Sequence, residues 1–91
     1  MYPYGSQEIK TVGIISGAGA TAVPETVNEN IDVLITGEPK EFAFHFAKDG
    51  KTNVIIAGHY KTERFGVQAL GELLKKKFNV KVEHIDVECK V

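Results

Sequence analysis

A histidine and a glutamate four residues apart, His59 and Glu63, are the side chains in this sequence best suited to chemistry. An imidazole nitrogen and a carboxylate oxygen make a suitable ligand pair for zinc, manganese or iron. Residues at i and i+4 lie on one face of a helix, so both side chains can reach one ion. The spacing also fits a turn histidine followed by an acid placed by the helix dipole. Because such metals need three or four ligands, the pair predicts at most part of a metal site.

A glycine-rich turn begins at Ser16 and continues through Gly19, and the letters GAGATA at residues 17–22 fit the pattern G-x-G-x-x-A. Glu38 follows the first of these glycines by 21 residues, which is the layout of a dinucleotide-binding fingerprint. The helix expected after the turn is short, however, and it contains Pro24. A tight turn whose backbone amides could hold an anion is the alternative. Nucleotide binding at this turn stays open.

The remaining aromatic and charged residues suggest no nucleic-acid site. Glu41 and His45, also four residues apart, most simply form a solvated ion pair. No basic residues interleave with Phe42, Phe44 and Phe46, as a surface that stacks nucleic-acid bases would require. The 91 residues include 11 Lys and Arg against 12 Asp and Glu, so the net charge of −1 favours neither nucleic acid nor an anionic membrane.

The sequence also bears on where the chain is expected to work. It contains no run of 18 apolar residues, so no membrane-spanning segment is expected. Residues 1–6 lack the basic and apolar regions of a signal peptide, and the single Cys89 excludes an internal disulfide. A cytoplasmic location is the expectation.

Three apolar runs, each ending in glycine, must position these side chains. They cover residues 12–17, 32–37 and 53–58, and β-branched residues dominate them. Continuous apolar runs are typical of strands buried on both faces of a parallel sheet. We therefore expect Ile14, Ile15, Val33, Ile35, Val54 and Ile56 to be buried in adjacent strands.

Helices are expected between and after these runs. The segments at about 21–30, from Glu38 to Gly50, and at about 61–78 carry helical spacing of apolar residues or helix-capping signals. Residues 80–87 are predicted to form a fourth strand, and residues 1–8 a flexible tail. Residues 9–91 then form a single α/β domain. The expected architecture is a three-layer sandwich with a largely parallel sheet of about four strands and helices on its faces.

The expected topology brings the candidate residues together. In open parallel sheets, ligands gather beyond the carboxyl ends of the strands. Those ends carry Ser16 with its glycine-rich turn, then Glu38, then His59 followed by Glu63. The polar residues worth considering therefore converge on one edge of the sheet.

The letters GHYKTER at residues 58–64 meet every fixed position of the pattern G-H-[HY]-x-[ST]-E-R. Residues 12–19 match V-x-x-x-S-G-x-G, residues 32–38 match D-x-[FL]-I-T-G-E, and residues 82–86 match V-x-[FH]-I-D. With these motifs in order, residues 8–87 resemble the carboxyl-terminal half of the Nif-three-like (NGG-one-interacting-factor-like, YbgI-type) family. Its members are often called GTP cyclohydrolase 1 type 2 homologues.

The resemblance implies a two-metal site at the strand ends, binding zinc, manganese or iron. His59 and Glu63 match two of the family's ligands, while an adjacent His-His pair and an Asp come from the amino-terminal half. The three histidines of this sequence are not adjacent. The chain is therefore expected to lack that half, to bind metal weakly alone, and to depend on the missing half for the other ligands. Family members form toroidal homo-oligomers, so self-association is also expected.

Three hypotheses about function follow. In the first, the chain is the partial metal-binding domain of a metal-dependent hydrolase resembling GTP cyclohydrolase. His59 and Glu63 would be ligands, and Glu38 would lie behind them and orient a ligand or a water. In the second, it is a non-catalytic oligomerisation or interaction module. In the third, the turn from Ser16 onward binds a nucleotide. No catalytic residue is assigned.

Overall fold

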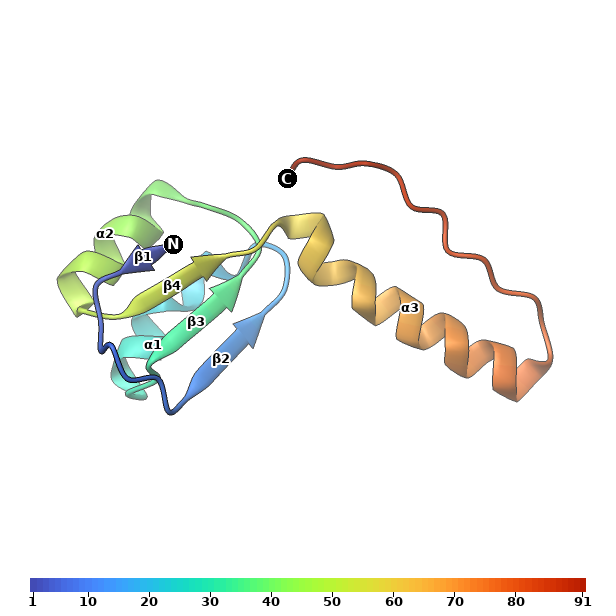
Figure 1. Ribbon diagram of the computed structural model, residues 1–91, viewed down its shortest axis with the longest axis horizontal. Helices are drawn as coiled ribbons and strands as arrows, with labels where there is room; N and C mark the ends of the chain where they lie inside the picture. Colours follow the sequence, from blue (N-terminus) through green and yellow to red (C-terminus); the bar gives the residue numbers. More distant parts are fainter.

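The computed structural model describes residues 1–91 as a small sheet-and-helix body from which one long helix extends (Figure 1). The strands are β1 (Tyr2–Pro3), β2 (Val12–Ile15), β3 (Val33–Thr36) and β4 (Asn53–Ile56). The helices are a 3₁₀ turn η1 (Gly19–Ala22), α1 (Val23–Asn28), α2 (Glu41–Gly50) and α3 (His59–Phe78). None of the helices combines the length and apolar character needed to cross a membrane.

The four strands form one sheet in the order β1-β4-β3-β2. β2, β3 and β4 are parallel, and the register aligns Ile14 with Ile35 and Ile35 with Ile55. β1 pairs with β4 in the antiparallel direction. The expected α/β class and largely parallel sheet of four strands are confirmed. All three parallel strands end at the same edge of the sheet, where the candidate residues follow them.

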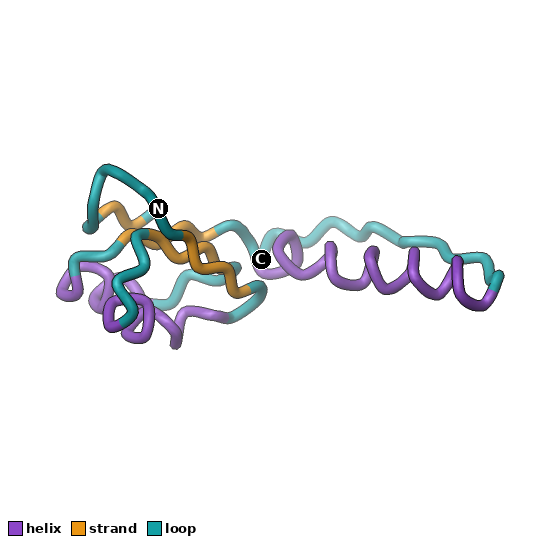
Figure 2. The backbone as a smooth tube through the Cα atoms, turned by 90° about the horizontal axis from the view of Figure 1, so that it is seen from below, coloured by secondary structure: helices purple, strands orange, loops and turns teal.

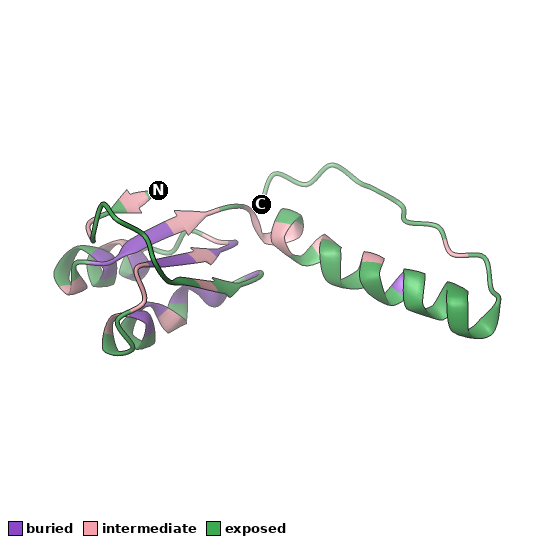
Figure 3. Ribbon diagram, turned by 60° about the horizontal axis from the view of Figure 1, so that its bottom comes forward, coloured by how far each residue is buried: buried purple, intermediate pink, exposed green.

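The core lies between the sheet and the layer formed by α1 and α2 (Figure 3). Leu34 and Val54 point into it from the central strands, and both are fully buried. Ala43 and Ala47, one turn apart on α2, are also fully buried, because small side chains let the helix lie close to the strands. Burying Leu34 is worth about 1.5–3 kcal/mol relative to exposing it.

The opposite face of the sheet is largely open, and Ile14 on this face is 72% exposed. Ile15, on the core-facing side of edge strand β2, is 40% exposed. The predicted burial of Ile14 and Ile15 is wrong, because the continuous apolar pattern does not reveal that β2 is an edge strand in this chain. The other predicted positions are better covered: Val33 and Val54 are buried, and Ile35 and Ile56 are half-buried.

Helix α3 extends away from the sheet, and residues 79–91 return beside it (Figure 2). The chain reverses at Asn79, which has a left-handed φ of 51°. Val82 then lies over Gly71, the only buried residue of α3. Most of the apolar side chains of α3 remain exposed, including Phe65, Leu70, Leu73 and Phe78.

Two predictions about the ends of the chain are corrected. Residues 80–87 form no strand; they follow the helix that leaves the sheet, so they meet α3 instead of a strand edge. The expected flexible tail, residues 1–8, instead contributes β1. Its aromatic rings explain this, because Tyr2 and Tyr4 pack edge-on against Phe44 of α2, with ring centroids 5.5 and 5.7 Å apart.

Candidate functional site

Three glycines that end the parallel strands lie side by side at the carboxyl edge of the sheet. The Gly37 amide donates to the Gly17 carbonyl at 2.9 Å, and the Gly58 amide donates to the Gly37 carbonyl at 3.0 Å. A Cβ on Gly37 would lie 2.5 Å from Gly17 O and 2.8 Å from His59 Cα, so only glycine fits there. The hydrogen-bond ladder of the sheet therefore continues beyond the strands, and it fixes where the next residues begin.

His59 and Glu63 lie on one face of α3 in its first turns. His59 follows Gly58, whose φ of 98° turns the chain from β4 into the helix. His59 Nε2 and Glu63 Oε1 are 3.1 Å apart, and the histidine side chain is 34% exposed. An imidazole nitrogen and a carboxylate oxygen thus face the same small volume, as the sequence spacing predicts.

Glu38 meets the other nitrogen of the same ring. Its Oε1 contacts His59 Nδ1, while its Oε2 pairs with Lys40 Nζ at 2.7 Å. The hydrogen bond that His59 donates to Glu38, aided by the charge of Glu63, raises the pKa of His59 above its ordinary value. In turn, the contacts with Lys40 and His59 lower the pKa of Glu38. Glu38 therefore stays ionised and fixes the orientation of the ring.

The turn after β2 forms one wall beside the His59–Glu63 pair. Gly17 has a φ of 69°, and a Cβ at this position would overlap Glu63 Oε1 and lie 3.1 Å from His59 Nε2. The absence of a side chain on Gly17 therefore lets the Glu63 carboxylate and the His59 ring lie directly against the backbone of this turn. One imidazole nitrogen and one carboxylate oxygen close together are donors that a borderline divalent metal such as zinc accepts, so the chemistry of the residues present fits such an ion.

Two threonine hydroxyls accept hydrogen bonds from backbone amides of the glycine-rich turn. The Gly17 amide donates to Thr62 Oγ1 at 2.9 Å, and the Gly19 amide donates to Thr36 Oγ1 at 3.0 Å. In a dinucleotide fingerprint the glycines let the backbone approach the pyrophosphate at the amino end of a helix. Here these amides are already used inside the protein, and α1 is only six residues long. The geometry argues against a nucleotide at this turn.

The other histidines lie outside this arrangement. His45 is paired only with Glu41, at 3.8 Å on the exposed side of α2. His84 lies 3.5 Å from the Tyr60 hydroxyl, which donates to Asp86 and so ties residues 84–86 to the first turn of α3. The hydrogen bond to Asp86 raises the pKa of Tyr60. No group of three or more His, Cys, Asp or Glu side chains is arranged to hold a metal ion within this chain.

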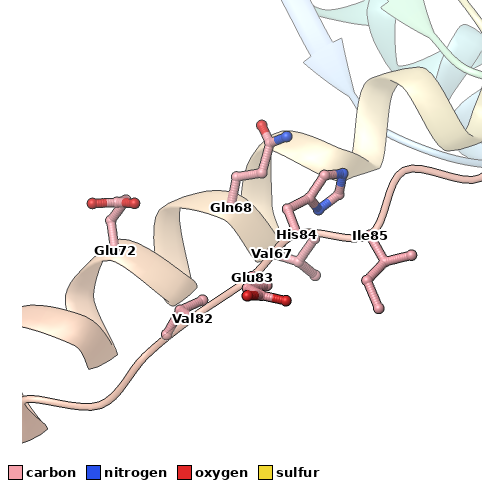
Figure 4. Close-up of a pocket in the computed structure, with 7 residues that line it drawn as sticks. All are labelled: Val67, Gln68, Glu72, Val82, Glu83, His84 and Ile85. Carbon is pink, nitrogen blue, oxygen red and sulfur yellow. The ribbon is translucent and has the colours of Figure 1, made fainter.

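A cavity of about 500 Å³ lies between α3 and the returning residues 82–85 (Figure 4). It begins at Val67, one helical turn beyond Glu63. Figure 4 shows Gln68 and His84 on one side of the returning segment and Glu83 on the other. Because its polar groups diverge, the cavity does not resemble a site built around a polar ligand.

The structure thus brings together His59, Glu63 and Glu38, the three residues chosen from the sequence. It places Gly17, which the sequence puts at this edge as part of the glycine-rich turn, against both side chains, and it adds Thr62, which sequence reasoning missed. Thr62 was signalled only by the fixed [ST] position of the motif at residues 58–64. Contacts between residues 45 positions apart leave no trace in local spacing.

Comparison with known proteins gives consistent matches. Residues 1–90 match the family described as Duf34/NIF3 (NGG1p interacting factor 3). A GTP cyclohydrolase 1 type 2 homolog of Pyrococcus abyssi is 48% identical over 93% of this chain and 34% of its own length. One of the same name from Archaeoglobus fulgidus is 38% identical over 93% of this chain and 35% of its own length. The chain thus spans about a third of the length of these relatives.

Solved structures give the same picture. The protein ybgI, whose function is described as unknown, superposes with a TM-score of 0.94 at 28% identity, covering 100% of this chain and 37% of its own. The structure of TTHA1606 from Thermus thermophilus superposes with a TM-score of 0.89 at 36% identity, covering 98% of this chain and 36% of its own. Both similarities include the extended α3 and the returning segment, since they cover nearly all of this chain.

Proposed function

This chain belongs to the Duf34/NIF3 family, and we propose that it supplies His59 and Glu63 to a divalent-metal site in a metal-dependent hydrolase. The observation that carries the proposal is the 3.1 Å approach of His59 Nε2 to Glu63 Oε1, against the side-chain-free turn at Gly17. Zinc, manganese and iron all suit this nitrogen–oxygen pair.

Glu38 prepares the histidine for this role. A carboxylate on Nδ1 favours the tautomer with its proton on Nδ1, which leaves the Nε2 lone pair free to bind an ion. By binding Nδ1, ionised Glu38 also keeps the His59 ring oriented with Nε2 facing Glu63. A bound divalent ion would supply Lewis acidity and a water of lowered pKa, the usual means of metal-assisted hydrolysis.

Two protein ligands do not complete such a site. Structural and catalytic zinc sites use three or four protein ligands, whereas this chain offers His59 and Glu63. We therefore propose that the remaining ligands come from another part of a longer protein or from another chain. The threefold greater length of the relatives supports this. Their name, GTP cyclohydrolase 1 type 2 homolog, makes a purine nucleotide the first substrate to test.

Titration with Zn²⁺ and Mn²⁺, followed by NMR, tests the metal site in the 91-residue chain. NMR detects weak binding and reports which residues respond. We expect Zn²⁺ to shift the signals of His59, Glu63 and Gly17, and His59→Ala or Glu63→Gln to weaken that response strongly. His45→Ala is the matched control, because His45 also has a glutamate four residues away but no carboxylate on its Nδ1. An equal loss in all three variants would contradict the proposal.

A role in subunit association is the second candidate. It is favoured by the exposed apolar side chains of α3 listed above and by the open apolar face of the sheet, since exposed apolar patches of this kind mark interaction surfaces. The two roles are compatible, because a partner covering this surface could also carry the missing ligands. Sedimentation velocity over a range of protein concentrations tests association, and a monomer at all concentrations would count against it.

A further inference from the structure

Thr62 lies between the two proposed ligands in sequence, and its hydroxyl joins the turn after β2 to the start of α3. The hydroxyl accepts a hydrogen bond from the Gly17 amide at 2.9 Å. As a donor it lies 2.8 Å from the Gly58 carbonyl and 3.0 Å from the His59 carbonyl. We propose that Thr62 is a positioning residue: its hydroxyl holds the turn at Gly17 against the His59–Glu63 pair and thereby sets the metal affinity. This inference rests on the proposed function.

The hydroxyl group is fully used in this arrangement. It has one proton to donate and lone pairs to accept. Its proton goes to a carbonyl at the start of α3, and a lone pair accepts from the turn after β2. A valine of nearly the same shape would leave the part-buried Gly17 amide without an acceptor, whereas a serine would keep both bonds.

The other bonds of this turn lead elsewhere. The Gly17 carbonyl accepts from Gly37, and the Gly19 amide donates to Thr36, so both bonds hold the turn to the end of β3. The bond to Thr62 is the only hydrogen bond between this turn and α3. Without it, the turn is tied to α3 only indirectly, through the backbone hydrogen bonds that link Gly17 to Gly37 and Gly37 to Gly58.

The distance matters because of where Gly17 lies. Its missing Cβ would overlap Glu63 Oε1 and approach His59 Nε2 to 3.1 Å, so the backbone of the turn is the wall nearest to both ligand atoms. A displaced turn would let the Glu63 carboxylate change rotamer and would admit more water. The hydroxyl of Thr62 therefore acts on the site without facing a ligand itself.

The test compares Thr62→Val with Thr62→Ser in the full chain, using two readouts. The first is the hydrogen-exchange rate of the Gly17 amide in metal-free protein. The second is the Zn²⁺ affinity from NMR titration, with His59→Ala as the variant that removes a ligand. We expect Thr62→Val to speed exchange at Gly17 and weaken Zn²⁺ binding by about tenfold, the lower end of what partners behind metal ligands contribute. Thr62→Ser should retain both parent values.

The outcomes separate this inference from the proposed function. If His59→Ala weakens binding and Thr62→Val does not, Thr62 has no positioning role, and the metal site stands. If exchange at Gly17 is unchanged in Thr62→Val, the inference is likewise overturned. If the parent binds Zn²⁺ no better than His59→Ala, the proposed metal site fails, and this inference fails with it. Should Thr62→Val not fold, Thr62→Ala, which lets water reach the Gly17 amide, takes its place.

Discussion

The carboxylate of Glu38, from the loop after β3, meets the Nδ1 side of the His59 ring at the start of α3. Glu38 itself is held by Lys40, and its side chain is only 17% exposed. Two adjacent parallel strands thus deliver one polar group each to a common point. The ring is left with a single nitrogen, Nε2, facing Glu63.

Replacing Glu38 with alanine should lower the pKa of His59 toward the ordinary histidine value. The hydrogen bond from the His59 ring to Glu38 is the largest cause that raises this pKa, and the charge of Glu63 is a smaller one. The same variant should weaken Zn²⁺ binding by about 10–100-fold, because the ring loses the partner that orients it. NMR titration of the histidine ring signals with pH measures the first effect. Lys40→Ala is the control, since it keeps the carboxylate on Nδ1; an unchanged His59 pKa in Glu38→Ala would contradict the expectation.

Replacing Gly17 with alanine should both destabilise the chain and push the Glu63 carboxylate away from its place beside His59. A non-glycine residue in the left-handed region costs about 1–2 kcal/mol, and the new methyl group would displace the Glu63 carboxylate. Gly66→Ala is the matched control, because nothing lies within 4 Å of a Cβ at Gly66. That change in an exposed helix should stabilise the chain by about 0.5–1 kcal/mol. Urea unfolding measures both, and equal effects would refute the reasoning about Gly17.

Asp32 should contribute to stability only when it is ionised. Its Oδ2 accepts from the backbone amides of Lys10 and Thr11 at 2.8 and 2.9 Å, and these bonds lower its pKa in the folded chain. A depressed pKa means that the stabilisation is complete above the ordinary aspartate value and is lost as pH falls through the folded value. Asp32→Asn should therefore lower Tm at neutral pH and flatten its decline in acid. Thermal unfolding between pH 7 and about 2 checks this; a parallel decline in parent and variant would contradict it.

Tyr60→Phe should release the returning carboxyl-terminal segment. The Tyr60 hydroxyl donates to Asp86 and lies 3.5 Å from His84, so its removal takes away the side-chain bonds that hold residues 84–86 to α3. We expect faster hydrogen exchange and proteolysis in residues 84–91, with the sheet unaffected. Tyr4→Phe is the control, because Tyr4 acts through its ring against Phe44. Unaltered protection of the segment would show that the backbone bond from the Tyr60 amide to the Val91 carbonyl suffices.

The part of the fold that local pattern determines was predictable. The three glycine-ended apolar runs became β2, β3 and β4, and the candidate residues were placed at their carboxyl ends because parallel strands share one edge. The convergence of His59, Glu63 and Glu38 followed from this topology. The expected helix at about 61–78 was also found, beginning two residues earlier at His59.

What failed depended on contacts distant in sequence. The apolar alternation of residues 80–87 suits a strand, but no sheet edge lies where α3 delivers them. β1 forms because Tyr2 and Tyr4 pack against Phe44, some forty residues away in the sequence. No local sequence pattern predicts that contact. The threonine that ties the glycine-rich turn to α3 was missed for the same reason.

Helix α3 is attached to the sheet at one end, and this makes it a lever whose pivot is Gly58. With a rise of about 1.5 Å per residue, a tilt of about 10° at the pivot would sweep Phe78 through roughly 5 Å and Glu63 through only about 1 Å. A partner bound at the distal end of the helix would therefore move Glu63 only about a quarter as far as it moves Phe78. A large movement of the distal end of α3 would therefore change the distance between Glu63 and Gly17 only slightly.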